Sequence, residues 1–335
     1  MKQLRISFAA LMVLLVNGCV GCFAQAPSIH ESQLPAQPPD ASSTLVKSPV
    51  VVYDMSDRYR KGLNREDFLL EVDNHSLPID FFRNQETAAS IVFLVDTSAS
   101  MKSKLGETSR YSFLPAAAAR FFRLSHTGNE YLVASFGLEP RIRLDWTAAA
   151  DEAMKALTTL ANEKPQGLTN VRDACFFGIA QALRGNKTKK VLVLFSDGQD
   201  TSNDSRVKSV NAKVLSRELL ENNIQIYIVN LASFQDGSAL SLIGEELLNS
   251  LVKPTGGSVF FPRNIAELNR SLEHLALTLH AQYEIGFYPP PTIEQKRRYK
   301  IKIRLAPQAM EKYKLKGMLI RHREGFSVAA IARSP

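Results

Sequence analysis

Cysteine is scarce in this sequence of 335 residues, and its scarcity excludes two kinds of site. Two of the three cysteines, Cys19 and Cys22, lie near the N-terminus, which leaves Cys175 alone in the rest of the chain. A lone cysteine cannot form an intramolecular disulfide, and the paired CxxC pattern of a zinc site is missing. Because Cys175 lies in the apolar stretch DACFFGIAQAL, we expect it to be a buried, small hydrophobic residue.

The apolar run near the N-terminus is too short to cross a membrane. Ile6–Val16 falls short of the ~20 residues that a spanning helix needs, and it follows two cations. This arrangement is typical of a secretory signal peptide, with cleavage after Ala24. Two alternatives stay open: lipidation at Cys19, since VNGC resembles a bacterial lipobox, and an uncleaved anchor. We therefore expect an exported protein that is secreted or lies in the periplasm or cell envelope.

The sequence also lacks the signatures of several enzyme classes. It contains no GxSxG, HExxH or P-loop motif, and its six histidines are scattered. Asp96 follows an apolar run, as the nucleophile of an aspartyl phosphatase does. Those enzymes need a second carboxylate two residues later, where this chain has Ser98. We expect no enzymatic activity, and a metal-dependent hydrolase is the least favoured alternative.

The charge balance is mildly basic. The net charge of +8 falls to +6 when Lys2 and Arg5 leave with the signal peptide. The densest cationic run, EQKRRYKIKIR near the C-terminus, is typical of a solvated strand edge, where cations deter pairing with other chains. An exported protein rarely meets nucleic acid, so we expect no nucleic-acid partner. Peripheral or lipid-anchored membrane association remains an alternative.

The region from about residue 88 to 282 alternates between apolar, strand-like runs and segments with the periodicity of helices. Continuous apolar runs such as IVFLV and VLVLF predict buried strands, and segments of helical periodicity lie between them. This order predicts a doubly wound, mostly parallel sheet with helices on both faces, with RIRLDW as an edge strand. Pro115 must lie in the first turn of its helix or kink it. We also expect a helix that ends at Gly185 and another that is capped by Asn264.

The segments on either side of this region have β-like alternation. We expect PVVVYDM to form a strand, and REDFLLEVDNHSLPIDFF to form two short strands around an Asn-His turn. These N-terminal strands are too few to fold alone, so they should pack with the C-terminal ones in a small antiparallel unit. The predicted organisation is a signal peptide (1–24), a disordered linker (25–47), an N-terminal β segment (48–87), the α/β domain (88–282), a C-terminal β segment (283–328) and a tail (329–335).

Polar residues follow two of the predicted central strands directly. Asp96, Ser98 and Ser100 follow the first, Asp197 follows another, and Thr169 lies in a glycine-containing loop before a helix. In a doubly wound sheet the ligand site lies at the carboxyl ends of the strands, so these side chains can converge. Carboxylates and hydroxyls without histidine or cysteine suit a hard cation, with Mg²⁺ expected ahead of Mn²⁺ or Ca²⁺. Each residue alone has a structural explanation, such as an N-cap at Thr169.

The five residues together resemble the metal-ion-dependent adhesion site of von Willebrand factor type A (VWA) domains. DTSAS, the Thr169 loop and SDG match its DxSxS…T…D pattern in order, although QGLTN has one glycine where two are frequent. The resemblance implies direct ligation by Ser98, Ser100 and Thr169, with Asp96 and Asp197 acting through water. It also implies that an acidic residue of a protein partner completes the coordination.

The flanking segments narrow the resemblance further. REDFLLEVDNHSLPIDFF before the domain and YEIGFYPPP…RRYKIKIRL…RHREGF after it are similar to secreted VWA-related proteins of Acidobacteria. KPTGGSVFF resembles the approach to the last strand of VWA domains in general. We therefore expect an exported binding protein whose Mg²⁺ captures an acidic group of a protein partner. The alternative is a structural or assembly component of the envelope, in which the metal only stabilises the fold.

Overall fold

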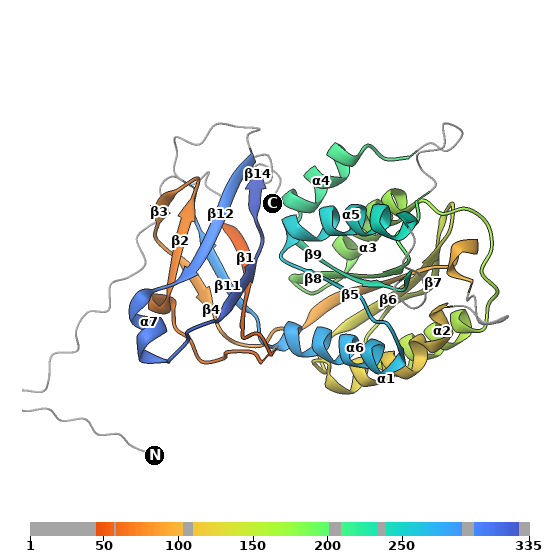
Figure 1. Cartoon of the computed structure of the whole chain (residues 1–335), viewed down its shortest axis with the longest axis horizontal. Helices are drawn as coiled ribbons and strands as arrows, with labels where there is room; N and C mark the ends of the chain where they lie inside the picture. Colours follow the sequence, from red (N-terminus) through yellow and green to blue (C-terminus); the bar gives the residue numbers. More distant parts are fainter. Residues whose placement is uncertain are drawn as a thin grey trace, which may run out of the picture. The chain divides into compact units, whose positions relative to one another are not determined.

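A six-stranded sheet is the centre of the computed structural model, which describes residues 45–56, 58–102, 110–200, 209–232, 239–289 and 298–327. The strand order is β10-β9-β8-β5-β6-β7, and all pairs are parallel except β6 with β7 (Figure 1). The strands are β5 (Ala89–Asp96), β6 (Glu130–Phe136), β7 (Pro140–Thr147), β8 (Lys189–Ser196), β9 (Ile224–Asn230) and β10 (Ser258–Phe260). The predicted doubly wound, mostly parallel sheet is confirmed, and the predicted edge strand RIRLDW lies in β7, which pairs antiparallel with β6.

Helices cover both faces of this sheet (Figure 1). Those on one face are α1 (Leu114–Leu124), α2 (Ala150–Ala161) and α6 (Ile265–His280); those on the other are α3 (Val171–Arg184), α4 (Ala212–Glu221) and α5 (Ala239–Val252). Successive residues of β5 point to opposite faces, so Phe93 joins the core under α1, α2 and α6, whereas Leu94 joins the core under α3, α4 and α5. The strand is apolar throughout because it is buried on both sides.

The helix ends follow the local signals in the sequence. Pro115 lies in the first turn of α1, where a missing N–H costs nothing, and Gly185 is the C-cap of α3. Asn264 caps α6 by accepting a hydrogen bond from the backbone N–H of Glu267 at 2.9 Å. Asn211 caps α4 by accepting a hydrogen bond from the backbone N–H of Lys213 at 2.8 Å. Within the described ranges, no helix has the length and apolar character needed to cross a membrane.

The flanking segments form two four-stranded antiparallel sheets, ordered β13-β1-β11-β4 and β14-β12-β2-β3. Their members are β1 (Val46–Tyr53), β2 (Phe68–Val72), β3 (His75–Leu77), β4 (Phe81–Arg83), β11 (Tyr283–Phe287), β12 (Arg298–Leu305), β13 (Leu319–His322) and β14 (Gly325–Ser327), with the helix α7 (Pro307–Lys312). Short 3-10 helices are η1 (Arg65–Asp67), η2 (Ala99–Met101), η3 (Arg110–Phe113) and η6 (Lys253–Thr255). The N-terminal strands β1 and β2 pair with the C-terminal strands β11 and β12, and the two sheets share one apolar core.

Two details of this β unit differ from the expectation. The turn after β2 is formed by Asp73 and Asn74, both with positive φ, rather than by Asn-His. His75 is therefore the first residue of β3. The segment also contains a third strand, β4, which joins the other sheet beside β11. Such a two-residue turn with left-handed residues matches the twist of the strands that it joins.

Arg323 links the β unit to the end of α4. Its guanidinium donates to the backbone oxygen of Lys47 at 3.1 Å, to Asn223 Oδ1 at 3.1 Å and to the oxygen of Gly325 at 2.9 Å, and it also bonds the oxygen of Leu220. The residue is buried and has no carboxylate partner among the described residues, and burial lowers its pKa to about 10. The cation lies at the carboxyl end of a helix, where positive charge is favourable.

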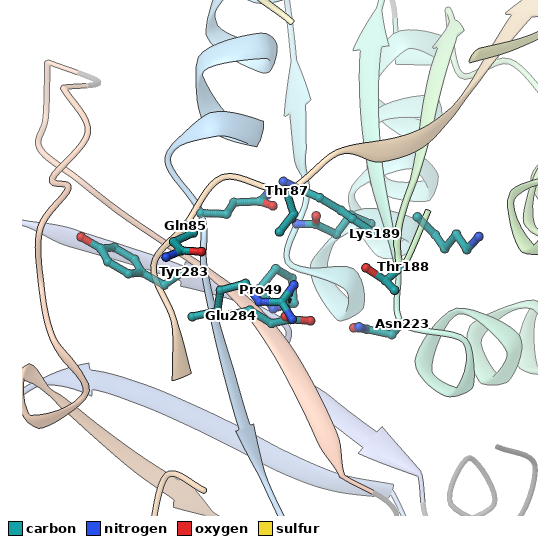
Figure 2. A pocket seen from close by; sticks show the side chains of 12 residues that line it. Pro49, Gln85, Thr87, Thr188, Lys189, Asn223, Tyr283 and Glu284 are labelled. Carbon is teal, nitrogen blue, oxygen red and sulfur yellow. Dashed lines mark ion pairs between the residues drawn. The ribbon is translucent and has the colours of Figure 1, made fainter. Parts of the chain in front are cut away.

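A small polar cavity lies near this contact, at the amino ends of the central strands (Figure 2). Thr188, Lys189 and Asn223 line it from the α/β domain, and Tyr283 and Glu284 line it from β11. Its volume of about 40 Å³ suits a few water molecules and excludes a larger ligand. This cavity is therefore no candidate for the ligand site.

Candidate functional site

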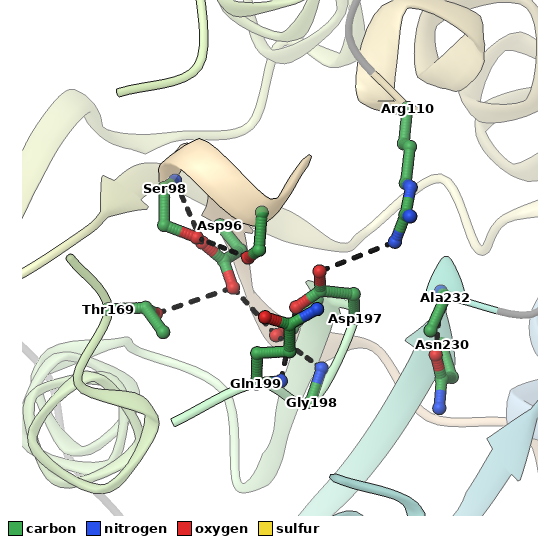
Figure 3. A network of polar contacts seen from close by, with 11 residues as sticks. Asp96, Ser98, Arg110, Thr169, Asp197, Gly198, Gln199, Asn230 and Ala232 are labelled. Atoms are coloured by element: carbon green, nitrogen blue, oxygen red, sulfur yellow. Dashed lines mark hydrogen bonds and ion pairs between the residues drawn. The ribbon is translucent and has the colours of Figure 1, made fainter. Parts of the chain in front are cut away.

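The candidate site lies at the opposite ends of the same strands. Asp96 is the last residue of β5, and Asp197 directly follows the neighbouring strand β8 (Figure 3). The register pairs Val95 with Phe195, so Ser196 lies beside Asp96 and Asp197 is one residue further along its strand. Both side chains are fully buried. The sheet topology thus brings two carboxylates together at its carboxyl edge, as the strand order predicts.

The first loop folds back onto its own aspartate. Asp96 Oδ1 accepts hydrogen bonds from the backbone N–H of Ser98 at 2.9 Å and from its hydroxyl at 2.6 Å. The hydroxyl oxygens of Ser98 and Ser100 are 3.1 Å apart. The backbone N–H of Thr97 donates to the oxygen of Phe136 at 2.7 Å, which anchors the loop to the end of β6. Alternate residues of this tight turn therefore aim three oxygen-bearing side chains at one place.

The loop that carries Thr169 is joined to the first loop through its backbone. The N–H of Gln166 donates to the oxygen of Thr97 at 2.9 Å, and the N–H of Ala99 donates to the oxygen of Gly167 at 3.0 Å. Gly167 has a φ of +77°, a conformation that glycine adopts without strain. One glycine in QGLTN is therefore sufficient to shape this loop.

Thr169 faces the carboxylates and has no capping role. Its hydroxyl donates to Asp96 Oδ2 at 3.4 Å, and the residue is 2% exposed. The cap of α3 is Asn170, whose side chain accepts from the N–H of Asp173 at 3.2 Å. The N-cap explanation for Thr169 is therefore wrong, because the helix begins one residue later than that explanation requires.

The third loop contributes a serine as well as the expected aspartate. The hydroxyl of Ser196 donates to Asp96 Oδ2 at 2.7 Å and accepts from the N–H of Gly198 at 3.0 Å. Asp197 Oδ1 accepts from the N–H of Gln199 at 3.1 Å. Ser196 was missed because the motif starts at the aspartate. Its position at the last residue of a central strand, beside Asp96, is the signal that could have found it.

A buried arginine also belongs to the site and was not anticipated. Arg110 Nη1 lies 3.3 Å from Asp197 Oδ2, and the arginine side chain is only 6% exposed (Figure 3). Arg110 begins η3 and lies far from Asp197 in the sequence. The burial of Arg110 could not be predicted from the sequence, because most arginines are exposed and a buried one depends on contacts that only the folded chain makes.

Burial leaves the charge of the two carboxylates poorly compensated. Burial raises the pKa of Asp96 to about 7, and the nearby charge of Asp197 acts in the same direction. The hydrogen bonds that Asp96 accepts from Ser98 and Ser196 lower this pKa but do not offset the effect of burial. Burial also raises the pKa of Asp197, opposed by the N–H of Gln199 and by smaller contributions from Ser100 and Arg110. A bound cation would relieve this unfavourable burial of negative charge.

The donor set fits a hard divalent cation. Two carboxylates and the hydroxyls of Ser98, Ser100 and Thr169 are oxygen ligands of the kind that Mg²⁺ and Ca²⁺ prefer. In the part of the chain that the structure describes, no group of three or more His, Cys, Asp or Glu residues could hold a metal. A cation here therefore depends on the hydroxyls, and the assignment of all five residues as ligands stays a prediction.

A groove of about 330 Å³ borders the site. Thr97 and Gln166 of the two joined loops line one side of it. Arg141 of β7 and Lys164 line it as well and have no ion-pair partner among the described residues, while Glu139 contributes one negative charge. The surface next to the candidate cation site is thus polar, with an excess of positive charge.

Comparison with known proteins identifies the central part of the chain. A family model for the von Willebrand factor type A domain matches residues 91–199. No protein with a curated description matches the sequence. Similar solved structures include a von Willebrand factor type A protein from Catenulispora acidiphila, with 11% identity, a TM-score of 0.44 and coverage of 88% of this chain and 78% of that one. BatB from Bacteroides thetaiotaomicron has 12% identity and a TM-score of 0.42, over 57% of this chain and 98% of its own.

Proposed function

Residues 91–199 of this chain form a von Willebrand factor type A domain, and from that premise we propose an exported binding protein that uses a metal-ion-dependent adhesion site. The domain supports a role in protein interaction or adhesion. In this proposal Ser98, Ser100 and Thr169 bind Mg²⁺ directly, and Asp96 and Asp197 hold it through water. The bound cation supplies an open coordination position for a carboxylate oxygen of a protein partner. The export step rests on the N-terminal segment, which lies outside the described residues.

One observation carries the proposal: two fully buried carboxylates converge with three hydroxyl groups at the carboxyl edge of the sheet. Two buried like charges raise each other's pKa and destabilise the fold unless a cation compensates them. An aspartyl nucleophile would need a carboxylate partner positioned for proton transfer, whereas the neighbour of Asp96 in the loop is Ser98. Cation binding is therefore favoured over catalysis.

The surroundings of the site support a partner that is acidic and partly apolar. Arg141 and Lys164 offer positive charge beside the loops, which would attract further carboxylates of the partner. Leu138 and Leu168 lie at the same edge and are each 48% exposed. The oxygen of Leu168 lies 3.0 Å from the place of a Cβ at Gly137, so these loops are in contact. Exposed leucines next to cations favour a peptide that carries both acidic and aliphatic residues.

The test is cation binding by the full chain, measured by isothermal titration calorimetry and by thermal unfolding with Mg²⁺, Mn²⁺ or Ca²⁺ against excess chelator. A cation at 100 times its Kd should stabilise the protein by about 2.7 kcal/mol. Asp96→Ala and Thr169→Val should abolish this stabilisation. The control is Asp145→Ala, because Asp145 is exposed and its carboxylate contacts Arg184 and the backbone N–H of Trp146 at the surface. If the wild type gains no stability from any of the three cations, the proposal is refuted.

A further inference from the structure

We propose that Arg110 is a built-in competitor of the cation: its guanidinium pairs with Asp197, and this pairing weakens divalent cation binding. The inference rests on the proposed function, because it concerns the control of the same site. In this proposal the site has two states, and in one of them the Arg110 guanidinium compensates part of the negative charge of the carboxylates. The arginine-paired and the metal-bound states then exclude or weaken each other.

The first observation is the burial of the pair. Arg110 is 6% exposed and Asp197 is 0% exposed, and 3.3 Å separates Nη1 from Oδ2. Among the ion pairs of the described residues, this is the only one with both side chains less than a tenth exposed. Solvent screens such a pair weakly, so its charge acts strongly on anything that binds next to it.

The second observation is that Arg110 is poorly satisfied. Its Nε is buried without a hydrogen-bond partner, and Asp197 is its only bonding or ion-pair partner in the described ranges. Arg323 is equally buried but donates hydrogen bonds to four different residues. A structural arginine is held on several sides, as Arg323 is. Arg110 has a single contact, of one nitrogen with one oxygen, and so has little to lose when that contact breaks.

The third observation is that Arg110 pairs with Asp197, one of the two proposed ligands that carry negative charge. The hydroxyl groups of the proposed ligands are neutral, so among these five residues the negative charge that attracts a cation comes from Asp96 and Asp197. Arg110 compensates one of these two carboxylates. A divalent cation must share Asp197 with the guanidinium or displace it, and it also meets the repulsion of a positive charge buried nearby. Arg110 therefore lowers the affinity of the site for cations.

The experiment compares the Kd for Mn²⁺ of the full chain by calorimetry and by electron paramagnetic resonance. Arg110→Met removes the charge and keeps the length of the side chain, and we expect it to bind Mn²⁺ at least tenfold more tightly, which is about 1.4 kcal/mol. Arg110→Gln should behave in the same way if the methionine variant folds poorly. Arg110→Lys keeps the charge and should stay close to the wild type. The control is Arg143→Met, since Arg143 pairs with Glu163 on the nearby surface and should change the Kd less than twofold.

The outcomes separate the two proposals. If the wild type binds Mn²⁺ and folded Arg110→Met binds it equally well or less well, competition by Arg110 is overturned while the adhesion site stands. If the wild type does not bind and Arg110→Met does, the adhesion-site proposal fails for the natural chain, whereas competition by Arg110 is supported. If neither binds although both are folded by circular dichroism, the adhesion site itself is refuted and the inference fails with it.

Discussion

The buried arginine at the joint of the β unit and the α/β domain gives the sharpest stability prediction. Arg323→Met should destabilise the protein by about 3 kcal/mol, although methionine fills much of the same volume. The guanidinium donates to the oxygens of Lys47, Leu220 and Gly325 and to Asn223 Oδ1. Methionine can replace the packing of the side chain but none of these bonds. Buried carbonyl groups are then left without a donor.

The magnitude follows from two opposing contributions. A hydrogen bond from a charged donor contributes roughly 1.5–3 kcal/mol, so four such bonds contribute about 6 kcal/mol at the low end. Burying an unpaired ion costs several kcal/mol of desolvation free energy. Removing the charge of Arg323 recovers part of this cost, about 3 kcal/mol. The bonds therefore outweigh the desolvation. A net loss of about 3 kcal/mol corresponds to a decrease in Tm of about 6–12 °C for a protein of this size.

Urea unfolding followed by circular dichroism and by fluorescence measures this loss. The sequence has one tryptophan, Trp146 in β7, so fluorescence reports on the α/β domain alone. The control is Arg304→Met, because Arg304 is exposed in the same β unit and bonds Glu71 at the surface; it should cost less than about 1 kcal/mol. Equal losses in the two variants, or no loss for Arg323→Met, would show that the buried network does not hold the two parts together.

Burial lowers the pKa of Lys189 from 10.5 to about 7 in the folded protein. Between pH 7 and pH 10.5, the unfolded chain therefore keeps a proton on Lys189 that the folded protein has lost. Stability should therefore rise by about 1–3 kcal/mol between pH 7 and pH 10 in urea titrations, and this rise should shrink in Lys189→Met. Gly257→Ala should prevent stable folding, because the added Cβ would lie 1.7 Å from the backbone oxygen of Ile226. Gly317→Ala is the control: Gly317 has a φ of +81° but open space around it, so this change should lower the free energy of unfolding by only about 1 kcal/mol in thermal unfolding. Phe93→Ala should cost about 3–5 kcal/mol in the same assay, since the ring is completely buried.

Local patterns predicted the central sheet well because each strand carries its own signal. The run before Asp96 is apolar at every position, which is expected only for a strand covered on both faces. Caps and breakers such as Asn264 and Pro115 act within one turn, so they too can be recognised from short stretches. The candidate site residues Asp96 and Asp197 could be predicted for the same reason: each lies where a recognisable strand ends.

The remaining features depend on contacts between distant segments. The Arg110–Asp197 pair joins residues 87 positions apart, and nothing in either local stretch indicates it. The turn after β2 was placed one residue too late because short strands have weak alternation, and a shift by one residue exchanges the two faces of a strand. Strand β4 was missed for a related reason: its three residues form a strand only because β11, about 200 residues later, pairs with them.

The candidate cation site and the β unit lie at opposite ends of the central sheet, and this separation bears on the proposed function. The candidate cation site lies at the carboxyl ends of β5 and β8, whereas the β unit contacts the α/β domain near Lys189 and Asn223, at the amino ends of β8 and β9. A strand of eight residues is about 26 Å long, so roughly this distance separates the site from the joint. A partner bound through the cation therefore need not touch the β unit. The proposed adhesion through the cation and the alternative assembly role of the β unit are therefore compatible in one chain, because they concern opposite ends of the sheet.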